Sequence, residues 1–113
     1  MPWIRAVSVR MLTHERARIG QRPVVEEALA LARREGLAAT VTRAQEGWSA
    51  HGGARAVNQV ELSDDLPIVI ELVASAERIE AALPALIAIA SIHGTVTLAD
   101  TRLWTQDVVP SSS

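Results

Sequence analysis

The segment that most constrains the fold is LPIVIELV, residues 66–73, because it is apolar on both faces of a strand. In an extended strand its even-numbered residues, all aliphatic, face one side, and two of the odd-numbered residues are valines. A sheet with one solvated face normally alternates apolar and polar residues, so something must cover the second face. We expect a second copy of the chain to do so, which predicts an oligomer. Glu71, in the middle of that face, then needs a partner such as Arg5 or Arg10.

Periodic segments follow one another along the chain in the order β-α-β-β-α-β. Strands are predicted at residues 3–12, 39–44, 66–73 and 95–105, with a further alternating stretch at 57–62, and helices at 23–35 and 75–92. We expect Gly36 to end the first helix, Ser75 to cap the second, and Pro84 to kink the second.

This order is that of the split βαβ, or ferredoxin-like, plan. The sequence therefore predicts an α+β sandwich in which a four-stranded antiparallel sheet carries two helices on one face. We expect a single domain at residues 1–107 and a disordered C-terminal tail at 108–113.

Composition narrows the chemistry of the chain. All 11 basic residues are arginines, and cysteine and tyrosine are absent, so Schiff-base, thiolate and phenol chemistry are excluded. The net charge of −2 argues against a nucleic-acid partner. No run of 18 uncharged apolar residues or signal-peptide pattern is present, so we expect a cytoplasmic protein. Any bound phosphate must be held by arginine or by backbone N–H groups.

Residues 42–57, TRAQEGWSAHGGARAV, form a glycine-rich connection between strands. Its central part, residues 45–56, is long for a hairpin turn, and long loops in compact domains usually serve a function. Trp48 lies between Gly47 and Ser49, which is a poor setting for a core residue, so we interpret it as an exposed anchor for a partner or ligand. Arg43, at the root of the loop, either forms a salt bridge to Glu46 or Glu61 or contacts an anion.

Three segments of the chain resemble a known family. They are EEALALARREGLAATVTRAQEGWSAHG at 26–52, LSDDLPIVIELV at 62–73 and AERIEAALPALIAIASIHGTVTLAD at 76–100. The most specific motifs are Arg-x-x-x-Gly-aromatic-x-x-His from Arg43 to His51, Ser-Asp-Asp-Leu-Pro at 63–67 and Val-Thr-Leu-x-Asp at 96–100. The chain is similar in these motifs to the PII-like proteins grouped as domain of unknown function 190, within the superfamily of nitrogen regulatory protein PII.

The resemblance implies a homotrimer of ferredoxin-like subunits with small effectors bound in the clefts between them. We expect a regulatory protein, not an enzyme, whose effector is an anion, with an adenine nucleotide such as AMP or ADP as the first candidate. The loop at 45–56, ordered by the ligand, would be presented to a partner such as a membrane transport protein. The expected ligand-binding residues are Arg43, Gly47, Trp48, His51, Gly52, His93, Gly94 and Thr95. Thr95 stands near the position where the PII proteins themselves use a lysine against phosphate.

Two other functions are compatible with the sequence. The first is a metal-binding trimer resembling the divalent-cation-tolerance proteins, in which His14, His51 and His93 of different loops would meet across subunits. The second is a small enzyme. Gly47–His51 comes within one residue of the Gly-x-Ser-x-Gly elbow, but that motif needs a strand-turn-helix setting, whereas strands are predicted on both sides here. We therefore expect no catalytic residue and no resident cofactor or metal.

Overall fold

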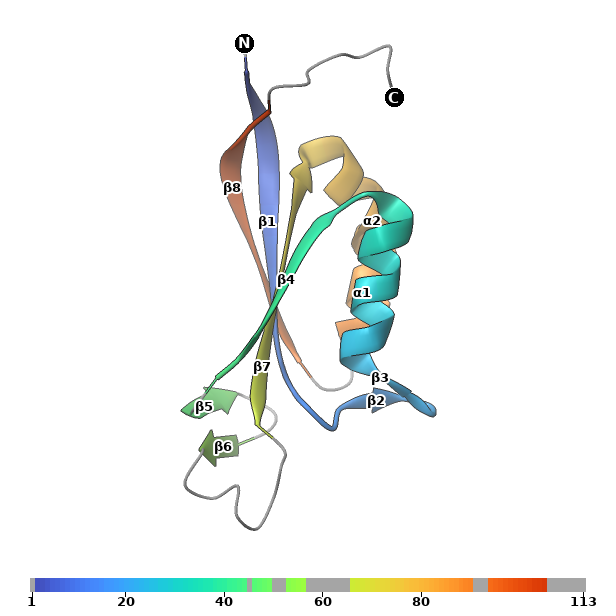
Figure 1. The fold of residues 1–113 in the computed structure, drawn as a ribbon, viewed down its shortest axis with the longest axis vertical. Coiled ribbons are helices and arrows are strands. Elements are labelled where there is room, and N and C mark those ends of the chain that lie inside the picture. Colours follow the sequence, from blue (N-terminus) through green and yellow to red (C-terminus); the bar gives the residue numbers. More distant parts are fainter. Residues whose placement is uncertain (1, 45, 50–52, 57–65, 91–93, 106–113) are drawn as a thin grey trace.

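The computed structural model describes residues 2–44, 46–49, 53–56, 66–90 and 94–105. Its principal elements are β1 (Trp3–His14), α1 (Val24–Glu35), β4 (Ala38–Arg43), β7 (Pro67–Ser75), α2 (Ala76–Ala90) and β8 (Thr95–Trp104) (Figure 1). Short strands form two hairpins, β2 (Arg18–Ile19) with β3 (Arg22–Pro23), and β5 (Glu46–Ser49) with β6 (Gly53–Ala56).

The four long strands form one antiparallel sheet in the order β4-β7-β1-β8. The two strands that follow the helices, β4 and β8, therefore occupy the two edges, and β7 and β1 lie between them. Both helices pack on the same side of this sheet (Figure 1). The predicted α+β, ferredoxin-like fold is confirmed. The stretch at 57–62 and the tail at 108–113 lie outside the described residues.

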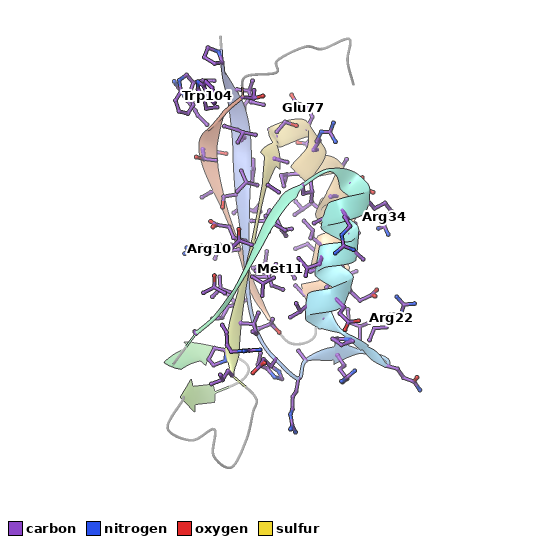
Figure 2. All side chains as sticks on the ribbon, in the orientation of Figure 1. Arg10, Met11, Arg22, Arg34, Glu77 and Trp104 are labelled. Atoms are coloured by element: carbon purple, nitrogen blue, oxygen red, sulfur yellow. The ribbon has the colours of Figure 1, made fainter. Side chains whose placement is uncertain are left out.

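The core lies between the helices and the inner face of the sheet. Met11 of β1 (Figure 2) is completely buried, as are Ile70 and Leu72 of β7 and Leu86 of α2. The even-numbered aliphatic residues of β7 are thus the core-facing set, as the alternation of the strand requires. Because the chain has no phenylalanine or tyrosine, this core consists of valine, leucine, isoleucine, methionine and alanine.

The helix ends follow the sequence closely. α1 ends at Gly36, which adopts the left-handed conformation (φ 72°) and donates its N–H to the Ala32 carbonyl. Ser75, the last residue of β7, accepts the Arg78 N–H on its hydroxyl oxygen at 3.3 Å and so caps α2. α2 continues through Pro84 to Ala90, and its predicted end at residue 92 lies outside the described residues.

The outer face of the sheet carries a row of polar residues across all four strands. The strand register aligns Thr40 of β4, Glu71 of β7, Arg10 of β1 and Thr97 of β8. The Glu71 carboxylate lies 3.5 Å from Arg10 Nε and accepts a 3.1 Å hydrogen bond from the Ser8 hydroxyl. Of the two predicted partners for Glu71, Arg10 is therefore confirmed.

Apolar residues flank this row on the same face. Val69 and Val73 lie on either side of Glu71 along β7, and the register places Leu12 of β1 beside Val69. All three are half-buried, and in the described part of the chain no helix covers this face. The outer face is thus mixed, with an ion pair at its centre and aliphatic side chains around it.

Two connections contain more structure than the sequence predicted. β1 continues past residue 12 to His14, because Thr13 and His14 still pair with Ile68 and Pro67 of β7. The segment that follows turns back as the β2–β3 hairpin at Gly20, where φ is 61°. The glycine-rich loop also contains a short antiparallel pair, β5–β6.

Candidate anion-binding site at the root of the long loop

Arg43 is the last residue of β4 and stands where the long loop begins. Its side chain is 61% exposed, and Nη2 forms an ion pair and hydrogen bond with Oε2 of Glu15. Glu15, which follows β1, is thus a partner of Arg43 that the sequence did not suggest. The two suggested partners, Glu61 and the side chain of Glu46, lie outside the part of the chain that the structure describes. A guanidinium has five N–H donors in one plane, so a contact from one carboxylate oxygen leaves donors for a second oxyanion.

Glu15 also contacts the chain at the far end of the loop. Its second oxygen, Oε1, accepts the Leu66 N–H at 3.4 Å, and its own N–H donates to the Leu66 carbonyl at 2.9 Å. The Ala44 N–H donates to the Pro67 carbonyl at 2.9 Å. The residues that enter and leave the loop are therefore held side by side, and Glu15 contacts both.

Sequence reasoning missed Glu15 because its partners are distant along the chain. The signal that identifies it is the strand register, since the ends of β1 and β4 both lie beside the start of β7. In a ferredoxin-like sheet these two strand ends flank the same central strand. An acidic residue just after the first strand and an arginine at the end of the second are thus brought within reach of each other.

Gly47 and Trp48 belong to β5, the strand nearest to Arg43 along the loop. They pair with Arg55 and Ala54 of β6. His51, Gly52 and His93 lie outside the described residues.

Gly94 and Thr95 stand at the start of β8, on the opposite edge of the sheet. The Gly94 N–H donates to the Ala90 carbonyl at 3.0 Å. A β-carbon added to Gly94 would lie 2.9 Å from the Leu12 carbonyl oxygen, so the close approach of backbone to backbone requires glycine here. Thr95 is half-buried and pairs with Leu12.

The described site residues Arg43, Gly94 and Thr95 share one end of the sheet but not one edge. Thr42, next to Arg43, lies in the same cross-strand row as Thr95, with Val69 and Leu12 between them. Three strand spacings separate the ends of this row, or about 14 Å. A single chain therefore does not bring Arg43 and Thr95 together on one small ligand.

The arginines of the β2–β3 hairpin have local partners. Arg18 Nη1 donates to the Gln21 carbonyl at 3.0 Å, and Arg22 Nη1 lies 3.0 Å from Glu27 Oε2 at the start of α1 (Figure 2). These contacts are typical of a solvated charged surface.

The described residues offer neither a metal-binding cluster nor a membrane-spanning helix. They contain no group of three or more histidine, cysteine, aspartate or glutamate side chains suited to hold a metal ion. No helix in the same part of the chain is both long enough and apolar enough to cross a membrane.

A model of the DUF190 family, described as "Uncharacterized ACR", matches residues 6–103. The chain belongs to the DUF190 family. The match runs from Ala6, within β1, to Leu103, the penultimate residue of β8, and it confirms the family inferred from the sequence motifs. None of the curated proteins is similar enough in sequence to match this DUF190 chain.

Solved structures with the same fold include PII-like proteins from two bacteria. One is CPII, a nitrogen regulatory PII-like protein from Thiomonas intermedia K12, solved with ADP, AMP and bicarbonate. It is 17% identical to this DUF190 chain, with a TM-score of 0.69 over 90% of this chain and 91% of that one.

A second structure of CPII, with ADP and bicarbonate, gives 19% identity, the same coverage and a TM-score of 0.66. A putative PII-like signaling protein from Thermus thermophilus gives 18% identity and a TM-score of 0.58, covering 99% of this chain and 97% of that one. At these identities the comparisons establish a shared PII-like fold.

Proposed function

We propose that this DUF190 protein is a PII-like regulatory protein that binds a small anionic effector between the subunits of a homotrimer. The observation that carries the proposal is the separation of Arg43 and Thr95 to opposite edges at one end of the sheet. If copies assemble edge to edge, the β4 edge of one subunit and the β8 edge of the next meet at a seam. Each seam then holds the Arg43 of one chain and the Thr95 of its neighbour.

The outer face of the sheet supports assembly. Half-buried Leu12, Val69 and Val73 surround the Arg10–Glu71 pair on a face without a covering helix in the described residues. Burial of aliphatic side chains against other copies contributes roughly 25 cal/mol for each Å² removed from water. The ion pair at the centre would neutralise the charges that such burial encloses.

The charge and the exposure of Arg43 support an anionic ligand. Because 61% of its side chain is accessible, its planar fork is available to a phosphate or carboxylate group. Gly47, Trp48, His51 and Gly52 of the long loop, with His93 and Gly94 before β8, would complete the cleft. The ligands of the PII-like structures from Thiomonas intermedia make an adenine nucleotide, AMP or ADP, the first candidate.

In this proposal the protein makes and breaks no covalent bond and is not an enzyme. The effector acts through its different affinities for two arrangements of the loop at 45–56, one of which is presented to a partner such as a membrane transport protein. The alternative of a metal-binding trimer has no specific support among the described residues.

The test is calorimetric titration of the purified protein with AMP, ADP, ATP, cyclic AMP and bicarbonate, alongside sedimentation to determine the assembly. We expect a trimer that binds AMP or ADP. Arg43→Gln should weaken binding about tenfold or more, because a hydrogen bond to a charged group is lost.

The control variant is Arg22→Gln, which removes an arginine from the same end of the molecule but should leave affinity unchanged. A folded trimer that binds none of these ligands would refute the nucleotide effector. A folded monomer at micromolar concentration would refute the site between subunits.

A further inference from the structure

The side chain of Glu15 contacts both ends of the long loop. Oε2 faces Arg43, just before the loop, and Oε1 accepts the N–H of Leu66, just before β7. The side chain of Glu15 is only 23% exposed, so water competes weakly for its oxygens. The Glu15 carboxylate therefore links Arg43 directly to Leu66, so a charge bound at Arg43 acts on the hydrogen bond to the Leu66 N–H.

The two contacts of Glu15 differ in strength. The contact with Arg43 joins two opposite charges, whereas the contact with the Leu66 amide is long, at 3.4 Å, and involves one charge. The backbone bonds beside it, from Glu15 N–H to Leu66 O and from Ala44 N–H to Pro67 O, are both 2.9 Å and do not involve the carboxylate. Movement of the Glu15 side chain would thus release the Leu66 N–H and leave the strand ends in place.

We propose that Glu15 is the internal counter-ion of the anion site and that an anionic ligand displaces it from Arg43. This proposal rests on the proposed function and adds its regulation. A phosphate or carboxylate group bound to the remaining donors of Arg43 places a like charge beside Glu15, which repels it. Glu15 then turns toward water and releases the Leu66 N–H. Binding of an anion at Arg43 in this way changes the hydrogen bonding of Leu66, where the loop rejoins the sheet.

The native protein provides the first test. Amide hydrogen exchange is followed by NMR at Leu66, Ala44 and Glu15 while AMP or inorganic phosphate is added. We expect exchange at Leu66 to become about two- to fivefold faster at saturation, the range set by the loss of one partly exposed charged contact. Exchange at Ala44 and Glu15, whose amides bond to backbone carbonyls, should not change.

Variants provide the second test. Glu15→Gln removes the competing charge at nearly constant volume, so affinity for AMP should rise about two- to fivefold and Leu66 should no longer respond to the ligand. Glu27→Gln is the matched control, because Glu27 is also half-buried, 29% exposed, and pairs with an arginine at 3.0 Å. The affinity of Glu27→Gln for AMP, and the change in exchange at Leu66 when AMP is added, should equal those of the native protein.

The outcomes separate this proposal from the proposed function. AMP binding with unchanged exchange at Leu66, or with equal affinity in Glu15→Gln, would overturn the displacement of Glu15 and leave the effector site intact. Failure of the native protein to bind AMP or phosphate would overturn both. If Glu15→Gln does not fold, the exchange measured at Leu66 in the native protein decides the question alone.

Discussion

At the scale of single residues, a contact of Arg78 beside Gly36 links α2 to the end of α1. Arg78, in the first turn of α2, donates from Nη1 to the Glu35 carbonyl at the end of α1, at 3.1 Å. This contact places a positive charge at the negative end of the α1 dipole and satisfies a carbonyl that has no partner within the helix. The guanidinium lies over Gly36, so close that a β-carbon there would be 2.4 Å from Nη1.

Replacement of Gly36 by alanine should therefore destabilise the protein in two ways. The left-handed conformation costs a residue with a β-carbon about 1–2 kcal/mol, and Arg78 must move away from the Glu35 carbonyl. Gly20→Ala is the control, because Gly20 has a similar φ of 61° but no atom within 4 Å of the added carbon. Urea denaturation should show a larger loss for Gly36→Ala, by about 1 kcal/mol. Equal losses would mean that the Arg78 contact adds no stability.

At the scale of elements, β7 passes into α2 without a connecting loop. Ser75 ends the strand and Ala76 begins the helix, so one residue both pairs with Ala6 of β1 and caps α2. Glu77 in the first turn adds a negative charge at the positive end of the helix (Figure 2). The direction of α2 across the core is thus fixed within two residues.

Loss of this cap should be measurable. Ser75→Ala removes the acceptor for the Arg78 N–H and should lower the free energy of unfolding by about 1 kcal/mol. Ser75→Asp keeps an oxygen at the same place and should recover most of the loss. Thermal and chemical denaturation of the three proteins check this, and equal stability of the alanine and aspartate variants would contradict the role of the cap.

The main strands and both helices were predictable because their signals are local. Alternation identified β1 and β7, and Gly36 and Ser75 marked helix ends correctly. The hairpins β2–β3 and β5–β6 are too short to show a period. Glu15 depends on register between β1, β4 and β7, which sequence spacing does not reveal. The association of Arg10 with Glu71 was predictable because a carboxylate placed among apolar side chains favours a cation on its own face.

At the scale of the whole molecule, the proposed assembly depends on the outer face of the sheet. Two ion pairs allow the assembly to be tested, because their distances and side-chain exposures are nearly the same in the single chain. Arg10–Glu71 and Arg34–Glu35 both measure 3.5 Å, with side chains 64% and 40% exposed in the first and 65% and 40% in the second. The first lies on the outer face of the sheet and the second at the end of α1 (Figure 2).

If other copies cover the outer face, the two pairs should respond differently to mutation. Arg34→Gln should change stability by less than about 1 kcal/mol, as for an exposed pair. Arg10→Gln would leave Glu71 charged and buried in the assembly and should cost about 3–5 kcal/mol. The loss should become smaller on dilution to concentrations at which the copies separate, since it acts on the assembled state. Denaturation at several protein concentrations measures both effects, and equal small losses would show the face to be open to water.

Two tryptophans lie at one end of the molecule and the third lies in the long loop at the other end, so tryptophan fluorescence can report on the loop. Trp3 and Trp104 face each other in the register of β1 and β8, both about half exposed, at the end of the sheet remote from β5. Trp48 is in β5, and the chain contains no tyrosine to contribute ultraviolet emission. Changing Trp3 and Trp104 to phenylalanine leaves a single fluorophore in the long loop. Its emission spectrum and quenching by iodide then follow events at the loop alone, without an added label.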